Sequence, residues 1–132
     1  MSDTTLDQLL GIEYPVIVAP MFLISNTDMV KAALRNGVTA AFPALNYRTD
    51  KELCNAIQEI KAYSNKPFGV NLIVNKSNPK YKSQLQTLVE LKVDYIITSL
   101  GNPKEVIEQA HAHGMKVFCD VVDLKYAKKV EE

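Results

Sequence analysis

Five short apolar segments alternate with five amphipathic helical segments along the chain, and this alternation constrains the fold more than any other feature of the sequence. The apolar segments begin near residues 16, 39, 68, 95 and 117. A chain in which each strand is followed by a helix forms a parallel sheet with right-handed crossovers. Two folds contain five such units: the N-terminal part of a TIM (β/α)8 barrel and a complete flavodoxin-like doubly wound sheet. The alternation alone is compatible with both.

The end of the chain favours the barrel. Residues 124–132 read as a helix that Asp123 caps, and the chain stops within it at Lys128-Lys129-Val130-Glu131-Glu132 without a glycine C-cap. A complete domain usually ends its last helix with a cap or a polar tail. We therefore expect residues 1–132 to be a single, partial β/α-barrel domain. The sequence is compatible with a natural, an engineered or a proteolytic fragment. Its first and fifth strands would have open edges, through which copies are expected to associate as homo-oligomers.

The composition excludes several classes of protein. Fifteen basic residues balance fifteen acidic ones, which argues against nucleic-acid binding. No apolar run approaches the roughly 20 residues of a membrane span, and the N-terminus lacks the regions of a signal peptide. Cys54 and Cys119 lie far apart without metal-ligand spacing, and His111 and His113 point to different helix faces. We expect a cytoplasmic protein that has no metal site and acts on a small molecule.

Asn71 is the first functional candidate. It lies within Lys66–Val74, a predicted strand in which Val70, Leu72, Ile73 and Val74 form an almost continuous apolar run, as in a parallel strand covered on both faces. A buried amide without partners costs about 1–3 kcal/mol, so it must meet backbone, another polar group or a ligand. Loops at the carboxyl ends of parallel strands build ligand sites. The two interpretations are therefore a ligand contact and an amide satisfied by neighbouring backbone.

Other polar residues lie near the expected strand ends. Thr98 and Ser99 end the fourth strand, where they suit either a ligand contact or a turn. Asp120 falls in the fifth apolar segment, where it would face the barrel mouth or pair with a neighbouring donor. Tyr47 and Arg48 lie on a loop and are better explained as solvated loop residues than as substrate contacts.

Two segments carry a resemblance to a known family. Gly11-Ile12-Glu13-Tyr14-Pro15-Val16-Ile17-Val18-Ala19-Pro20-Met21 and Pro67-Phe68-Gly69-Val70-Asn71-Leu72 resemble the first and third strands of the nitronate monooxygenase family, formerly called 2-nitropropane dioxygenases. The fifth strand and residues 123–132 also resemble this family, which includes FMN-dependent enoyl-ACP reductases. The resemblance implies a TIM barrel that binds FMN at its C-terminal face and oxidises alkyl nitronates with O₂. The flavin would take electrons from the nitronate and then react with oxygen.

The resemblance also assigns cofactor contacts. Ala19, Pro20 and Met21 match the segment that runs beside the flavin, and Asn71 matches the asparagine that contacts FMN. Without the resemblance, Met21 at a strand end is equally explained as a filler of gaps in the core.

The chain departs from the family pattern at two loops. Phe22-Leu23-Ile24 and Phe42–Tyr47 stand where glycine-rich turns are usual. The family's phosphate loops and catalytic histidine belong to the second half of the barrel, so the catalytic residues are unknown and the truncated chain is expected to be inactive alone. The alternatives are an enzyme resembling FMN-dependent enoyl-ACP reductase and a non-catalytic flavodoxin-like binding module.

Overall fold

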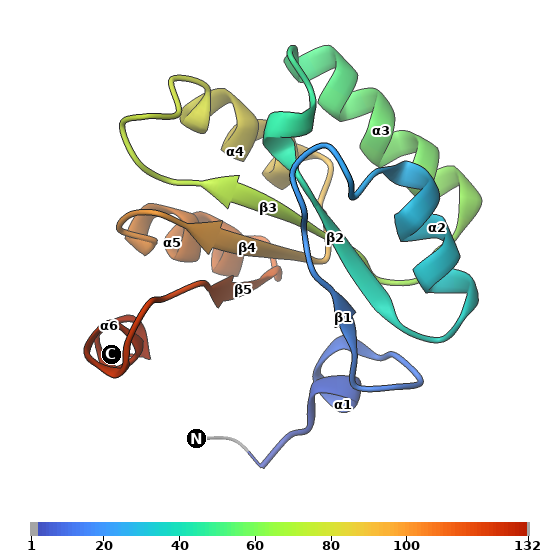
Figure 1. Cartoon of the computed structure of the whole chain (residues 1–132), viewed down its shortest axis with the longest axis horizontal. Helices are drawn as coiled ribbons and strands as arrows, with labels where there is room; N and C mark the ends of the chain where they lie inside the picture. Colours follow the sequence, from blue (N-terminus) through green and yellow to red (C-terminus); the bar gives the residue numbers. More distant parts are fainter. Residues whose placement is uncertain (1–2, 132) are drawn as a thin grey trace.

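The computed structural model describes residues 3–131 as one parallel five-stranded sheet with helices along the chain between its strands (Figure 1). The strands are β1 (Ile17–Val18), β2 (Thr39–Pro43), β3 (Gly69–Ile73), β4 (Tyr95–Ser99) and β5 (Lys116–Cys119). The helices are α1 (Leu6–Leu10), α2 (Thr27–Arg35), the 3₁₀ turn η1 (Ala44–Asn46), α3 (Asp50–Tyr63), α4 (Tyr81–Glu90), α5 (Lys104–Ala112) and α6 (Leu124–Glu131).

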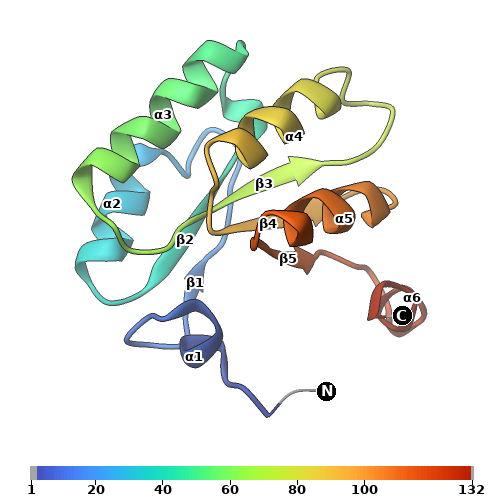
Figure 2. The same ribbon diagram turned by 180° about the vertical axis from the view of Figure 1, so that it is seen from behind.

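The order of the strands decides between the two predicted folds. Neighbours in the sheet follow the chain as β1-β2-β3-β4-β5, and every pairing is parallel. A doubly wound sheet places later strands on both sides of the first, so the flavodoxin-like alternative is wrong. The sheet curls with α2, α3, α4 and α5 on its outer side, as in the N-terminal part of a TIM barrel (Figures 1 and 2). That prediction is confirmed.

Local signals in the sequence set several helix boundaries. Asn26 caps α2 by accepting a hydrogen bond from the Met29 N–H at 3.0 Å. Thr49 and Glu52 form the reciprocal capping box that their spacing predicts at the start of α3. Gly37, just beyond the end of α2, has φ +78°, a conformation that favours glycine. These interactions satisfy backbone groups that the helix ends would otherwise leave unpaired.

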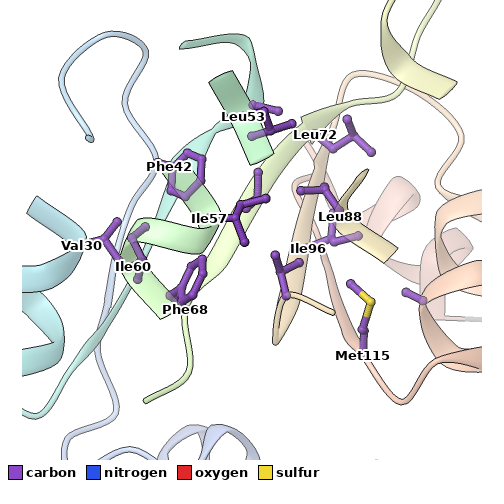
Figure 3. Packing of buried hydrophobic residues seen from close by; sticks show 14 of the residues in the cluster. Val30, Phe42, Leu53, Ile57, Ile60, Phe68, Leu72, Leu88, Ile96 and Met115 are labelled. Atoms are coloured by element: carbon purple, nitrogen blue, oxygen red, sulfur yellow. The ribbon is translucent and has the colours of Figure 1, made fainter. Parts of the chain in front are cut away.

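The outer core lies between the sheet and its helices (Figure 3). Alternate residues of each strand point to this side because successive side chains of a strand face opposite ways. Phe42 of β2 is fully buried there, and its ring stacks against Phe68 at 6.4 Å and meets the edge of Tyr47 at 5.8 Å. The other labelled members are Val30, Leu53, Ile57, Ile60, Leu72, Leu88, Ile96 and Met115.

A second, smaller cluster lies on the inner face of the sheet, opposite the helices. Tyr95 is fully buried there, packs edge-on against Phe118 at 5.4 Å, and shares the cluster with Leu10 of α1. Thr39 Oγ1 donates to the Pro67 carbonyl at 2.8 Å, so its remaining contact, at 3.0 Å, accepts from the Tyr95 hydroxyl. Helix α1 thereby covers the inner face at the end where the strands begin (Figures 1 and 2).

Burial of Tyr95 predicts a loss of stability at alkaline pH. Desolvation raises the pKa of its hydroxyl from 10.0 to about 12, so the folded state holds the proton more tightly than the unfolded chain does. This contribution is fully present below pH 10.0 and is lost as the pH rises towards about 12. We expect the free energy of unfolding in urea to fall over that range, and Tyr95→Phe to reduce the slope. Tyr81, whose pKa is also raised to about 12, requires a parallel Tyr81→Phe control. Equal slopes in wild type and Tyr95→Phe would contradict the assignment.

Three elements differ from their predicted extents. The sequence Tyr14–Met21 predicts a first strand of that extent, but the strand pairs only at Ile17 and Val18, since prolines flank it on both sides. The sequence Lys116–Val122 predicts a fifth strand, but β5 ends at Cys119, one register position short of the end of β4. Pro79 predicts the first turn of a helix, but helix α4 begins at Tyr81, so Pro79 precedes it.

Helix α6 differs most from its prediction. Its apolar stripe of Leu124, Ala127 and Val130 predicts a buried face, yet the helix buries none of its described residues and Leu124 is 70% exposed. In Figure 2 the helix lies apart from the other helices, beyond β5. The part of the chain that the structure describes has no strand beyond β5, so the helix lacks the sheet surface against which its apolar stripe would pack.

Candidate functional site

The candidate site is the edge of the sheet where the strands end, here called the mouth. All five strands are parallel, so the loops that follow them meet at this edge. The first of these loops contains Ala19, Pro20 and Met21; polar side chains near the ends of β3, β4 and β5 lie on the inner face beside it. The mouth thus contains all four of the predicted cofactor contacts.

Asn71 lies on the inner face of β3, half-buried and in register with Ile97 of β4. Its Nδ2 donates to the Ile97 carbonyl oxygen and to Ser99 Oγ, both at 2.9 Å. Within residues 3–131, no hydrogen bond engages its Oδ1. Every buried side-chain N or O atom among these residues has a hydrogen-bond partner, so Oδ1 is not buried and solvent reaches it. The structure therefore satisfies the nitrogen of the amide internally, in line with the backbone interpretation, and leaves the oxygen for another group.

Ser99 and Asp120 extend this polar arrangement along the mouth. Ser99 Oγ donates to Asp120 Oδ2 at 3.4 Å, and the Asp120 N–H continues the ladder by donating to the Thr98 carbonyl at 2.9 Å. Ser99 falls on the same face as Asn71 because it pairs with Ile73, two residues further along β3. Asp120 continues this face, because it follows Cys119, which pairs with Thr98. Both interpretations of Asp120 hold: it lies at the mouth and contacts a neighbouring donor.

Ser25 organises the loop that follows β1. Its buried hydroxyl donates to the Ala19 carbonyl at 3.1 Å and accepts from the Met21 N–H at 2.8 Å. The Met21 carbonyl accepts from the N–H groups of Ile24 and Ser25. Since these backbone groups are used within the loop, residues 19–21 can offer a ligand mainly apolar surface, to which the Met21 side chain, 41% exposed, contributes.

The tip of the same loop is apolar and held in place. Phe22, Leu23 and Ile24 are all well exposed, and Leu23 has φ +61°, an uncommon conformation for a bulky residue. Asn46 of η1 stabilises it, since its Oδ1 accepts from the Leu23 N–H at 2.8 Å and its Nδ2 donates to the Ser25 carbonyl at 2.6 Å. The departure from the family's glycine pattern thus produces a fixed apolar rim at residues 22–24.

Sequence reasoning missed the roles of Ser25 and Asn46. Sequence alone explains Ser25 as a helix cap and Asn46 as a loop residue, because serine and asparagine are common in every turn. Tyr47 packs on Phe42, and burial raises the pKa of its hydroxyl. Arg48 is exposed, as expected of a loop residue, and its backbone N–H donates to Glu52. Neither observation gives these two residues a part in the site.

A cleft of about 710 Å³ lies elsewhere, on the outer side of the sheet between α5, β5 and α6. Val117, Cys119 and Val130 contribute to its lining. It lies on the face opposite Asn71, and it is the space that the loose packing of α6 leaves between helix and sheet. Across residues 3–131, no cluster of three or more His, Cys, Asp or Glu side chains could hold a metal ion. Over the same residues, every helix is too short or too polar to cross a membrane.

The fold and its mouth define the N-terminal part of a TIM barrel whose polar groups gather at the carboxyl ends of the strands. The sequence profile of one family, described as nitronate monooxygenase, matches residues 3–132. The chain belongs to the nitronate monooxygenase family, a family of oxidoreductases. The resemblance inferred from the strand motifs is thereby confirmed.

Individual relatives have several activities. A (3aS,4S,5R,7aS)-5-hydroxy-7a-methyl-1-oxo-octahydro-1H-indene-4-carboxyl-CoA dehydrogenase of Rhodococcus jostii (strain RHA1) is 30% identical over 127 residues, which cover 96% of this chain and 35% of that protein. A probable nitronate monooxygenase of Staphylococcus haemolyticus (strain JCSC1435) is 34% identical over 85 residues, or 64% of this chain and 22% of that protein. The chain therefore spans about a third or less of the length of these curated relatives.

Solved structures agree with the fold. FabK from Thermotoga maritima superposes with a TM-score of 0.88 and 27% identity, over 99% of this chain and 41% of that one. A nitroalkane oxidase from Streptomyces ansochromogenes gives a TM-score of 0.84 at 19% identity, over 97% of this chain and 45% of that one. The second likeness concerns the fold alone.

Proposed function

We propose that the chain belongs to an FMN-dependent oxidoreductase that resembles nitronate monooxygenase and oxidises alkyl nitronates with O₂. The observation that carries the proposal is the state of Asn71: a half-buried amide at the mouth whose nitrogen is held by Ile97 and Ser99 while its oxygen stays open to solvent. Membership of the nitronate monooxygenase family supports the reaction class. The family is established, whereas the substrate and the electron acceptor of the whole protein are proposed here.

The residues at the mouth fit a flavin. The isoalloxazine ring is a flat, largely apolar system with a polar edge that includes one N–H donor. Asn71 Oδ1 could accept from such a donor, and the surface of residues 19–21, with the exposed Met21 side chain, could lie against the ring. When bound, FMN supplies the electron-accepting chemistry, and the protein supplies position and electrostatics. We assign no residue as catalytic acid or base, and we expect the chain alone to bind cofactor without turning over nitronate.

A second candidate substrate is an acyl thioester, as in enzymes resembling FMN-dependent enoyl-ACP reductase. Two observations favour it: the fixed apolar rim at residues 22–24, which suits a larger apolar substrate, and the relative from Rhodococcus jostii, whose name specifies a carboxyl-CoA substrate. In the whole flavin-loaded protein without oxygen, a primary nitronate should reduce the oxidised flavin, whereas an enoyl thioester should reoxidise flavin that dithionite has reduced beforehand. Reoxidation by the thioester without reduction by the nitronate would favour the second candidate.

FMN binding is the direct test. We expect the purified protein, titrated with FMN, to retain absorption near about 450 nm after removal of free cofactor. Asn71→Ala should weaken binding about fivefold to tenfold, since it removes one hydrogen-bond acceptor. Asn36→Ala, at the exposed end of α2 and far from the mouth, is the matched control and should bind as wild type does. A protein that stays colourless in excess FMN would refute the cofactor assignment.

We also propose that copies of the chain associate through the edges of β1 and β5. Within the described residues both strands have a neighbour on one side only. Exposed apolar side chains lie close to both edges, with Val16 beside β1 and Val122 beyond β5. Unpaired edges with apolar flanks recruit partners, and the net charge of zero adds no repulsion between copies. Sedimentation at tens of micromolar should reveal dimers or larger species. A monomer at all concentrations would contradict this proposal.

A further inference from the structure

Three polar side chains form a line across the mouth, one from each of three neighbouring strands or strand ends. Asn71 Nδ2 donates to Ser99 Oγ at 2.9 Å, and Ser99 Oγ donates to Asp120 Oδ2 at 3.4 Å. Asn71 Nδ2 also donates to the Ile97 carbonyl oxygen at 2.9 Å. Two groups at its ends, the Ile97 carbonyl and the Asp120 carboxylate, can only accept hydrogen bonds. They determine the direction of every hydrogen bond between the three side chains.

The direction follows from elementary donor and acceptor counting. An ionised carboxylate only accepts, so the single Ser99 hydroxyl hydrogen points to Asp120. The Ser99 oxygen then has only lone pairs to offer to Asn71. A backbone carbonyl also only accepts, so Ile97 requires a donor from the same amide. Both hydrogens of Asn71 Nδ2 are therefore committed, and a flipped amide would set its oxygen against two acceptors.

The remaining group of the amide is its oxygen, which faces solvent at the mouth. We propose that Asp120 is a positioning residue that acts through Ser99 to hold the Asn71 carboxamide with its Oδ1 presented to ligand. An amide held in this way selects a ligand that donates an N–H and disfavours one that offers only acceptors. The inference rests on the proposed function in one respect: the N3–H group of FMN is the donor that it would match. The orientation itself concerns residues of this chain alone.

The orientation can be tested without any cofactor. In ¹⁵N-labelled apo protein, the Asn71 side-chain NH₂ signal is assigned by its loss in Asn71→Asp, and its hydrogen exchange with water is measured. We expect exchange to become about fivefold to tenfold faster in Ser99→Ala and in Asp120→Ala, because each removes one member of the line. Glu108→Gln, which neutralises an exposed carboxylate on the outer helix α5, is the control and should leave the signal unchanged. Unchanged exchange in Asp120→Ala would overturn the positioning role.

The acceptor role is tested by comparing FMN with N3-methyl-FMN, which lacks the N–H donor. We expect the wild type to bind FMN about tenfold more tightly, the value of roughly one hydrogen bond. In Asp120→Ala this preference should shrink to about threefold or less, because the amide is no longer fixed. Equal affinities of the wild type for both flavins would overturn the acceptor role. If the wild type bound neither flavin, the proposed cofactor would be wrong, whereas the apo exchange measurement would still decide whether Asp120 positions Asn71.

Discussion

Replacing Gly69 with alanine is expected to destabilise the protein by at least about 3 kcal/mol or to prevent its folding. A Cβ at this position would lie 2.1 Å from Cε2 and 2.4 Å from Cδ2 of Tyr95. The Tyr95 ring cannot move aside easily, because its hydroxyl is bonded to Thr39 and its edge packs on Phe118. The strand cannot shift either, since β3 pairs with a strand on each side. Urea unfolding followed by circular dichroism measures the loss.

Two further variants make this prediction specific. Gly114→Ala is the matched glycine control: a Cβ at Gly114 would meet no atom within 4 Å, so only the φ of +73° should matter, at about 1 kcal/mol. In the double variant Gly69→Ala with Tyr95→Ala the clash is absent, so the combined loss should be well below the sum of the two single losses. Additive losses would show that Gly69 and Tyr95 do not compete for the same space.

Phe42→Ala is the second change with a large expected effect, a loss of about 3–5 kcal/mol in the free energy of unfolding. Phe42 is fully buried in the outer core between the rings of Phe68 and Tyr47, so its removal leaves a cavity that these rings cannot fill without leaving their own contacts. Phe22→Ala is the matched control, because Phe22 is 59% exposed and its truncation should change stability by no more than about 0.5 kcal/mol. Similar losses in both variants would contradict the core that the structure places at Phe42.

The parts of the fold that sequence predicted best are those set by local chemistry. Thr49 and Glu52 satisfy each other's backbone groups within one turn, so their spacing alone predicts the start of α3. The extent of β1 depends instead on its pairing with β2, which sequence does not display. The burial of α6 likewise depends on a neighbouring surface, so an apolar stripe at Leu124, Ala127 and Val130 predicted a buried face that the described chain does not form.

The candidate site shows the same division. Asn71 is conspicuous in the sequence because a lone amide in an apolar strand needs an explanation. Ser25, which holds residues 19–21, is not conspicuous, because only the fold reveals that its hydroxyl bonds to the Ala19 carbonyl and the Met21 N–H at once. The roles of Asn71 and of residues 19–21 as cofactor contacts remain predictions, which FMN titration will decide.

The position of α1 has a consequence for ligand access. Leu10 and the Tyr95 ring fill the inner face at the end where the strands begin, so within residues 3–131 they block the approach to Asn71 from that end. The Tyr95 ring then limits how deeply any ligand can enter. A ligand longer than this depth would extend out of the mouth past Phe22, Leu23 and Ile24. These residues, rather than those at the bottom of the site, would then distinguish ligands of different length.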